Sequence, residues 1–226
     1  MQRRRTGLRV QRLKPGCCLA LALIGLIFWN AEAWATETAA VRRVNDGDTV
    51  ELRDGRLVRY IGVDAPEIDH ARHTAQPMGF EARMRNAELV AGKPVRLEFD
   101  IERLDRHGRT LAYLFQPGGA MVNELLLESG LAFCLFTLPN VKYDRRLLAA
   151  QHAAMRAKRG IWQNWREAEG RYVGNRNSRR FHRAGCPEAK RISPRNRVIF
   201  SKRWDAFWAG YSPSRECLPN AAAPSD

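Results

Sequence analysis

The sequence predicts an α+β fold built on a small closed barrel of five short strands, with three helices and a small C-terminal accessory unit. The first observation behind this prediction is the order of the elements, in which three strands, a helix, two strands and two helices follow one another. The second is the shortness of the strands, because closure into a barrel removes the exposed edges of a small sheet. The 226 residues, 45% of them hydrophobic, suffice for one ordinary domain with an appendage.

Residues 40–63 carry the three-stranded part of this prediction. Branched apolar residues recur over 41–44, 49–52 and 57–63 in short segments typical of strands. The turn signals Asn45-Asp46-Gly47 and Asp54-Gly55 separate these segments. We therefore expect a three-strand meander.

Helices and two further strands follow the meander. Apolar residues at helical spacing predict a first helix over 79–91. Alternation predicts strands over 95–99 and 111–115. Two more helices are expected over 121–128 and 143–158, where Gly130 and Gly160 supply stop signals.

The first 35 residues have the pattern of an export signal. Basic residues precede an apolar run of thirteen residues over 17–29, and the small-residue site Ala33-Trp34-Ala35 follows this run. The alternative is an uncleaved membrane anchor, but the run is shorter than the ~20 residues that span a bilayer. We expect cleavage after Ala35, a periplasmic or extracellular protein, and no stable membrane association after cleavage.

The chain is strongly basic, with a formal net charge of +14. A basic surface suits nucleic acid, because each phosphate that is neutralised releases condensed counterions. The alternative is an arginine-rich composition produced by a GC-rich genome. Residues 167–226 hold 12 basic and six acidic residues, and we expect them to form an accessory domain after a first domain over 36–166. We expect a monomer.

Charged residues at the ends of the predicted strands suit phosphodiester chemistry. Asp48 and Asp64 are short carboxylates that suit a hard cation, which prefers oxygen ligands and acts as a Lewis acid toward a phosphate. Arg59 and Arg109 are candidates for a bidentate clamp on the phosphate oxygens. Glu67 is a candidate general base for the attacking water. Singly these residues have ordinary readings as a turn, a surface arginine or a solvated loop, but together they favour a metal-dependent nuclease.

Specific motifs between residues 41 and 162 make this chain resemble the thermonuclease family, that is, staphylococcal nuclease and its homologues. They are Asp46-Gly47-Asp48-Thr49, residues 59–67, Gly79-Phe80-Glu81-Ala82, Asp105-Arg106-His107-Gly108-Arg109 with Leu111-Ala112-Tyr113, and Val122-Asn123-Glu124 with Gly130-Leu131-Ala132. The resemblance implies an OB-fold barrel with three helices, dependence on one Ca²⁺, and hydrolysis of DNA and RNA with low sequence specificity to products with 3′-phosphates.

The resemblance also implies a role for each site residue. Arg59 and Arg109 would bind the phosphate, and Glu67 would be the base. Calcium would be held by the carboxylates of Asp48 and Asp64 and by the main-chain carbonyl of Ala65. Asp46 and Thr49 would support these ligands, and the expected substrate-binding residues are Arg106, His107 and Phe136.

Three of these positions depart from the family's pattern. Ala65 stands where the best-known member has Thr, which a carbonyl ligand tolerates. His107 and Phe136 stand where that member places tyrosines, and both rings are able to stack on bases. The rival hypothesis is a catalytically inactive OB-fold module that binds nucleic acid or a protein. Such a module would be expected to have lost Glu67 or one of the two arginines.

Residues 172–219 contain His182, Cys186 and Cys217 at a spacing that suggests a metal site lacking one ligand. This stretch resembles the small Cys-rich zinc domain of methylphosphotriester DNA-repair proteins, with Ser214 where that pattern has a further Cys. Two readings stay open, a zinc site with three ligands and a disulfide between Cys186 and Cys217, which export favours.

Two further features of the sequence bear on function. Cys134 lies in an apolar run and is expected to be a buried thiol. The basic run of Arg176, Arg179, Arg180 and Arg183 is either a solvated face or an electrostatic guide for nucleic acid.

Overall fold

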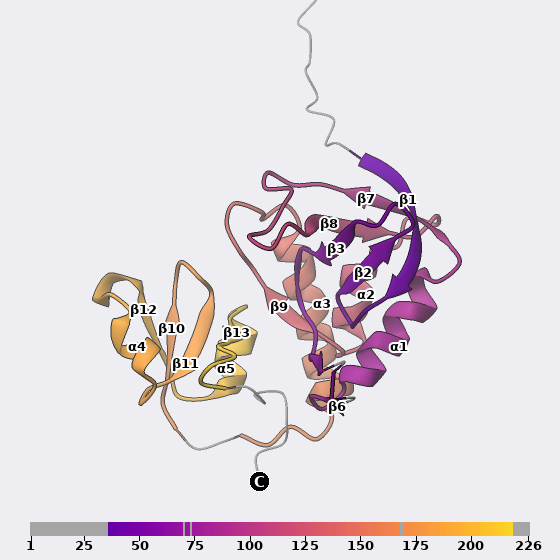
Figure 1. Cartoon of the computed structure of the whole chain (residues 1–226). Coiled ribbons are helices and arrows are strands. Elements are labelled where there is room, and N and C mark those ends of the chain that lie inside the picture. Colours follow the sequence, from indigo (N-terminus) through magenta and orange to yellow (C-terminus); the bar gives the residue numbers. More distant parts are fainter. Residues whose placement is uncertain (1–35, 70, 73, 168–169, 219–226) are drawn as a thin grey trace, which may run out of the picture. The chain divides into compact units, whose positions relative to one another are not determined.

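The computed structural model describes residues 36–218 except 70, 73 and 168–169, so the predicted export signal over 1–35 lies outside the described residues. Five strands close into a barrel in the order β1-β2-β3-β8-β7 (Figure 1), which confirms the predicted OB-fold. They are β1 (Thr36–Val44), β2 (Thr49–Leu52), β3 (Leu57–Tyr60), β7 (Pro94–Glu98) and β8 (Thr110–Phe115). Strands β3 and β8 run parallel, and the other neighbouring pairs are antiparallel.

The barrel interior is apolar because strand side chains alternate between its two faces. In β7, Val95 and Leu97 are at most 1% exposed, whereas Arg96 between them is partly exposed. Val50, Val58 and other large side chains fill the same core. Each such side chain contributes roughly 1.5–3 kcal/mol when it is fully buried.

The three predicted helices are present as α1 (Gly79–Val90), α2 (Val122–Glu128) and α3 (Asp144–Arg156). Helix α1 contacts β1 and α2, and α2 contacts β8 and α3 (Figure 1). Helix α1 buries Ala82, Asn86 and Val90, which lie four residues apart and therefore share one face of the helix.

The segment 57–63 was predicted as one strand, and this prediction was wrong. Strand β3 ends at Tyr60, and a separate strand β4 (Gly62–Asp64) pairs with β9 (Phe133–Leu135) instead. The break occurs because Gly62 adopts a φ of 79°, a conformation that strains residues with a Cβ. A short hairpin of β5 (Ile68–Asp69) and β6 (Thr74–Ala75) follows.

Residues 172–213 form a second sheet in the order β12-β10-β11-β13. Its elements are β10 (Tyr172–Asn175), β11 (Arg180–Arg183), β12 (Arg197–Phe200) and β13 (Ser212–Pro213), with helices α4 (Pro187–Arg191) and α5 (Arg203–Trp208). Two 3₁₀ turns lie at η1 (Gly160–Trp162) and η2 (Pro194–Asn196). None of the helices in the described part of the chain has the length and apolar character to cross a membrane.

The second sheet and helix α5 share a hydrophobic core with β9 and η1, which precede them in the chain. Phe181 and Phe207 pack in one cluster with Phe133 and Trp162. The side-chain amide of Gln151 in α3 also donates to the carbonyl of Phe207 at 2.6 Å. The division at residues 166 and 167 stays a prediction, and this shared core shows how closely the two segments are packed.

Candidate active site

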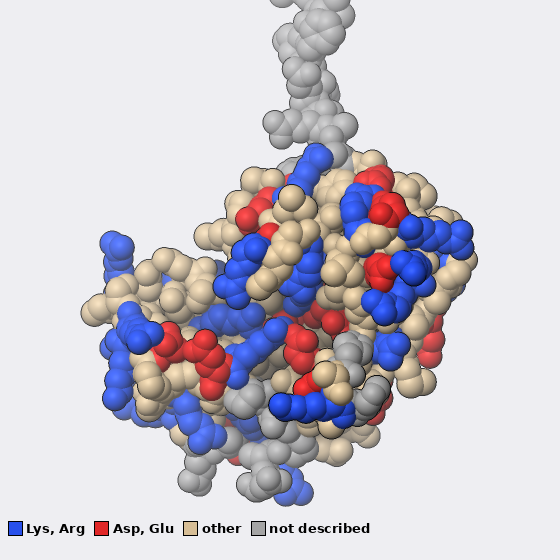
Figure 2. Space-filling model, viewed as in Figure 1, with Lys and Arg blue, Asp and Glu red and all other residues tan. Residues whose placement is uncertain are grey.

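A cavity of about 390 Å³ lies beside the mouth of the barrel, at β2, β3 and the loop before β8. Figure 2 shows acidic side chains gathered near the middle of one face, with Lys and Arg side chains beside them. The charged and polar residues lining the cavity include Asp46, Asp48, Thr49, Arg59, Glu67, Asp105, Arg106, His107, Arg109, Arg180 and Arg215. Most of the residues predicted for the site therefore lie around one cavity.

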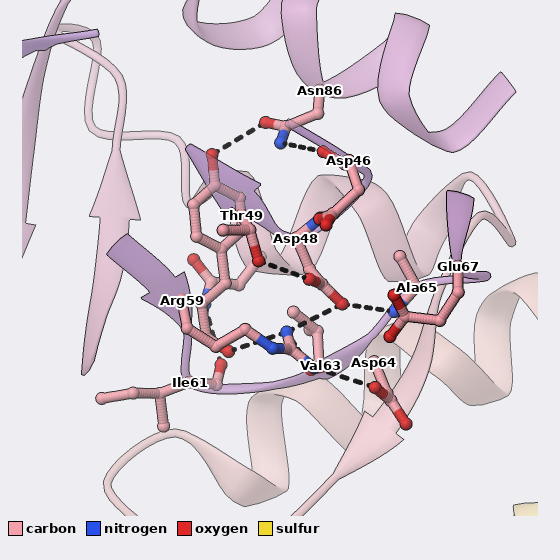
Figure 3. Close-up of polar contacts among 12 residues, drawn as sticks. Asp46, Asp48, Thr49, Arg59, Ile61, Val63, Asp64, Ala65, Glu67 and Asn86 are labelled. Atoms are coloured by element: carbon pink, nitrogen blue, oxygen red, sulfur yellow. Dashed lines mark hydrogen bonds and ion pairs between the residues drawn. The ribbon is translucent and has the colours of Figure 1, made fainter. Parts of the chain in front are cut away.

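Arg59 of β3 occupies the centre of this arrangement, and its side chain is only 9% exposed. Its Nη1 lies 2.7 Å from Asp48 Oδ2, and its Nη2 lies 2.8 Å from Asp64 Oδ1 (Figure 3). Nη1 also donates to the carbonyl of Val63 at 2.9 Å. All three charged side chains are buried. Removing Arg59 would leave Asp48 without its guanidinium partner in a medium that penalises lone charges, whereas Asp64 would keep Arg180 and Arg215.

Asp48 is held by donors from two directions. Its Oδ2 accepts a hydrogen bond from the backbone N–H of Ala65 at 2.6 Å, and its Oδ1 accepts one from the Thr49 hydroxyl at 3.0 Å. Burial raises the pKa of Asp48 to about 7, and the negative charges of Asp46 and Asp64 add to this rise, whereas Arg59 opposes it. Burial is therefore the main factor that disfavours the ionised carboxylate, and a bound cation would favour it.

The Asp46-Gly47-Asp48 turn is fixed against α1 by a residue that sequence reasoning missed. The Asn86 side-chain amide donates to the carbonyl of Asp46 at 3.0 Å, and its Oδ1 accepts from the Tyr60 hydroxyl at 2.8 Å. A Cβ on Gly47 would lie 2.5 Å from the Cβ of Ala65, so only glycine allows this close approach. The sequence did contain a signal for Asn86, because it is a polar residue on the otherwise apolar face of the predicted helix, where a buried hydrogen-bonding role is expected.

Asp64 is the last residue of β4, and Glu67 follows three residues later. Burial acts to raise the pKa of Asp64, but the guanidinium groups of Arg59, Arg180 and Arg215 outweigh it, so this pKa lies below its ordinary value. The Glu67 side chain is 42% exposed. Partial burial raises the pKa of Glu67, and the charges of Asp48 and Asp64 act in the same direction. A raised pKa brings a carboxylate closer to the basicity that a general base needs.

Arg109 reaches the cavity from the loop that precedes β8. Asp105 holds this loop, since its Oδ1 accepts from the backbone N–H of Arg109 at 3.0 Å and its Oδ2 accepts from Arg109 Nε at 2.7 Å. Arg106 and His107 also line the cavity, and Arg106 Nε donates to His107 Nε2 at 3.1 Å. Phe136 is 8% exposed and belongs to the hydrophobic core, so this position does not favour its predicted stacking role.

The donor set fits a hard divalent cation. Asp48 and Asp64 supply carboxylate oxygens, and the Ala65 carbonyl belongs to the segment that Asp48 holds in place. The negative charges of Asp48, Asp64, Asp46 and Glu67 all act on the buried guanidinium of Arg59. In this form of the protein, Arg59 bridges the two carboxylates that are predicted to bind the ion.

Comparisons of the sequence with known proteins identify its family. The sequence matches the family described as "Staphylococcal nuclease homologue" over residues 57–164. It is 43% identical over 131 residues to a thermonuclease of Staphylococcus hyicus, covering 57% of this chain and 77% of that protein. The chain belongs to the staphylococcal nuclease family. It is also 40% identical over 158 residues to a thermonuclease of Staphylococcus intermedius, covering 64% of this chain and 94% of that protein.

Membership of the staphylococcal nuclease family makes this chain a nuclease of the phosphodiesterase type, with nucleic acid as its substrate class. Another relative, the endonuclease YncB of Bacillus subtilis, is 38% identical over 139 residues, which cover 59% of this chain and 63% of that protein. The second sheet, β10 to β13, lies beyond the residues that match the family.

Two arginines of the C-terminal segment, Arg180 in β11 and Arg215 in the turn after β13, contact the site, and sequence reasoning did not assign them to it. Arg180 Nη1 lies 3.1 Å from Asp64 Oδ2, and Arg215 Nη2 lies 2.6 Å from Asp64 Oδ1. Arg180 belongs to the basic run noted in the sequence, but no local pattern marked Arg215. Both are separated from Asp64 by more than 100 positions, so only tertiary packing reveals the contact.

Cys186, which precedes α4, and Cys217, which follows β13, form a disulfide. His182 Nδ1 lies 3.6 Å from Cys217 Sγ, so the three predicted zinc ligands do lie together. In this oxidised form the sulfurs are bonded to each other and offer no thiolate, so the group does not fit a structural zinc site with four ligands. The remaining described cysteine, Cys134, is free and buried, as predicted.

Proposed function

We propose that this protein is an exported, calcium-dependent nuclease that hydrolyses DNA and RNA with low sequence specificity and leaves 3′-phosphates. The observation that carries the proposal is the convergence of Arg59, Arg109 and Glu67 on one cavity beside the Asp48 and Asp64 carboxylates. These are the groups that phosphodiester hydrolysis requires, since the substrate's negative charge must be screened before water attacks.

In the proposed mechanism, Arg59 and Arg109 bind the non-bridging oxygens of the scissile phosphate. A guanidinium fork suits this task because it donates two parallel hydrogen bonds, and its charge stabilises the transition state. Asp48, Asp64 and the Ala65 carbonyl would hold the calcium ion, which when bound screens the phosphate and acts as a Lewis acid. Asp105 keeps the Arg109 side chain directed at the cavity.

Glu67 is the proposed general base. It takes a proton from a water molecule as the water oxygen attacks phosphorus, and the bond from phosphorus to the 5′ oxygen breaks. The 5′ oxygen leaves and takes a proton from solvent, Glu67 then returns its proton to solvent, and the phosphate stays on the 3′ side. The side chain of Glu67 is partly exposed at the cavity, which gives water access to it.

We further propose export to a periplasm or the medium, with residues 1–35 as the cleaved signal. The Cys186–Cys217 disulfide supports this location, because disulfides persist in oxidising compartments. A monomer without stable membrane association is proposed for the mature form. N-terminal sequencing of secreted material, light scattering and flotation with vesicles test these three points.

The decisive experiment follows cleavage of single- and double-stranded DNA and RNA by the chain that begins at residue 36, with calcium or with a chelator. Calcium-dependent cutting should vanish in Glu67→Gln and Arg109→Ala, and end-group analysis should find 3′-phosphates. Glu88→Gln, an exposed acid on α1, is the matched control and should cut like the wild type. Binding without cutting would instead support the inactive OB-fold module.

A further inference from the structure

The C-terminal segment brings Arg180 of β11 and Arg215 of the turn after β13 to the acidic cavity, although this segment lies outside residues 57–164, which match the nuclease family. We propose that these two arginines bind a phosphate of the nucleic-acid strand next to the scissile one, so that the C-terminal segment forms part of the substrate site. This inference rests on the proposed function. In this proposal, the basic C-terminal segment contacts the phosphate that neighbours the scissile phosphate.

The guanidinium of Arg215 has N–H donors that the carboxylates do not use. Its Nη2 lies 2.6 Å from Asp64 Oδ1 and 2.5 Å from Glu67 Oε1. Within the described part of the chain, the polar contacts of this guanidinium are all made by Nη2. A guanidinium carries five N–H donors, so Nη1 and Nε together keep three for another acceptor. Since the side chain is 51% exposed and lines the cavity, an incoming phosphate is able to reach these donors.

Arg180 is held more firmly than Arg215. Its Nη1 donates to the carbonyl of Pro213 at 2.9 Å and to Asp64 Oδ2 at 3.1 Å. Strands β11 and β13 pair here, with Arg180 opposite Ser212, so the backbone itself fixes the position of the guanidinium. Its side chain is 26% exposed and also lines the cavity. Arg180 therefore offers a preorganised positive charge, and Arg215 is the more exposed of the two.

The two arginines that the barrel is proposed to direct at the scissile phosphate are both already paired with carboxylates. Arg59 is engaged by Asp48 and Asp64, and Arg109 is engaged by Asp105. A nucleic-acid strand carries a phosphate at every nucleotide, so the neighbours of the scissile phosphate also require positive groups. Arginines are well suited to this, because their planar fork matches two phosphate oxygens.

The contrasting reading is that Arg215 blocks the site, since it contacts two carboxylates that are proposed to act on calcium and water. Two observations argue against a firm block. The contact with Glu67 is an exposed ion pair, which is weak and readily exchanged, and the buried Asp64 keeps Arg59 and Arg180 as partners when Arg215 turns away. Arg215 is able to turn from the carboxylates to a phosphate while the fold stays intact. The two readings predict opposite effects of removing the side chain.

The test measures binding of a fluorescein-labelled single-stranded DNA 12-mer by anisotropy over a series of salt concentrations, with a chelator present to prevent cleavage. The variants are Arg215→Ala, Arg215→Lys, Arg180→Ala and Arg180→Lys, and the matched control is Arg195→Ala. Arg195 is an exposed arginine of the same segment that does not line the cavity.

We expect each alanine variant of the pair to bind about tenfold more weakly, as the loss of one charge-assisted contact predicts. The slope of log affinity against log salt should fall by about 0.7 for each lost phosphate contact. Lysine at either position should restore the slope and only part of the affinity, and Arg195→Ala should leave both unchanged. With calcium, KM should rise in the alanine variants more than kcat falls.

Two results would overturn the proposal. One is binding by the alanine variants with the affinity and salt slope of the wild type. The other is an Arg215→Ala variant that binds calcium more tightly by titration calorimetry and cleaves faster, which would make Arg215 a block on the site. If the wild type does not cleave at all, the proposed nuclease mechanism fails, but the comparison of salt slopes still decides whether the pair binds phosphate.

Discussion

Arg59 Nη2 lies 2.8 Å from Asp64 Oδ1, and the two side chains are only 9% and 2% exposed. A buried ion pair adds little to the free energy of unfolding compared with a well-packed apolar pair. Removing only one of its two charges is costly, because the remaining charge is buried with fewer opposite charges around it. The same contact joins β3 to β4, the two segments separated by the turn at Gly62. The arginine that is proposed to bind phosphate is therefore also part of the structural support of the site.

We expect Arg59→Ala to lower the free energy of unfolding by about 3–5 kcal/mol, because it leaves Asp48 and Asp64 without their shared partner. Urea unfolding followed by circular dichroism measures this loss. Arg42→Ala is the control, since Arg42 forms an exposed pair with Glu51 and its removal should cost at most about 1 kcal/mol. Equal stability of the two variants would show that the buried pair does not support the fold.

The raised pKa of Asp48 predicts a pH-dependent stability in the absence of divalent metal. Its pKa is about 7 in the folded protein against an ordinary value of 3.8, so the folded state binds the proton more tightly. The contribution of this group to stability therefore falls as pH rises from about 4 to about 7, and is level outside that window. Asp48→Asn should gain stability relative to the wild type across the same window.

Unfolding free energies measured at several pH values with a chelator present check this expectation. Asp69→Asn, at an exposed carboxyl group, is the control. A constant difference for Asp48→Asn would mean that burial does not disfavour the ionised form.

Glu67→Gln should lower kcat by about 10²-fold or more, the range expected for a general base. The substitution should hardly change stability, because the side chain is 42% exposed and its contact with Arg215 lies at the surface of the cavity. Initial rates on labelled single-stranded DNA with saturating calcium measure the effect. Cleavage near the wild-type rate would assign the base to another group.

Asn86→Ala should destabilise the protein by about 1–3 kcal/mol, because it leaves the carbonyl of Asp46 and the hydroxyl of Tyr60 without their partner. Thermal and urea unfolding measure the loss. Tyr60→Phe is the companion variant, since it removes only the hydroxyl group of this network. Asn86→Ala should cost more than Tyr60→Phe, and the reverse order would mean that the turn at Asp46 does not depend on α1.

Ser214→Cys tests whether the C-terminal segment retains the remnant of a zinc site. After reduction, His182, Cys186 and Cys217 would be joined by a fourth ligand, and structural zinc sites have four. We expect elemental analysis to find more zinc in the reduced variant than in the reduced wild type, and His182→Ala in the same background to reverse the gain. An unchanged zinc content would reject the idea of a degenerate metal site.

The predictions from sequence were accurate where the signal was local. The period-two pattern of residues 95–99, the turn at Asp46-Gly47 and the helical spacing over 79–91 each depend on a few neighbouring residues, and the structure confirms them. The single strand predicted over 57–63 was wrong, because Gly62 turns the chain in a conformation that the apolar run does not reveal. The pairing of β4 with β9 was missed for the same reason.

By itself the sequence determined the barrel, its three helices and the group of carboxylates and arginines at the strand ends, since turn chemistry and hydrophobic periodicity act over short distances along the chain. Tertiary structure alone decided that Arg59 bridges Asp48 and Asp64, that Asn86 holds the turn at Asp46, and that Arg215 meets Asp64 from 151 positions away. These contacts join residues distant in sequence, and they exist only because the packing of the whole chain brings those side chains together.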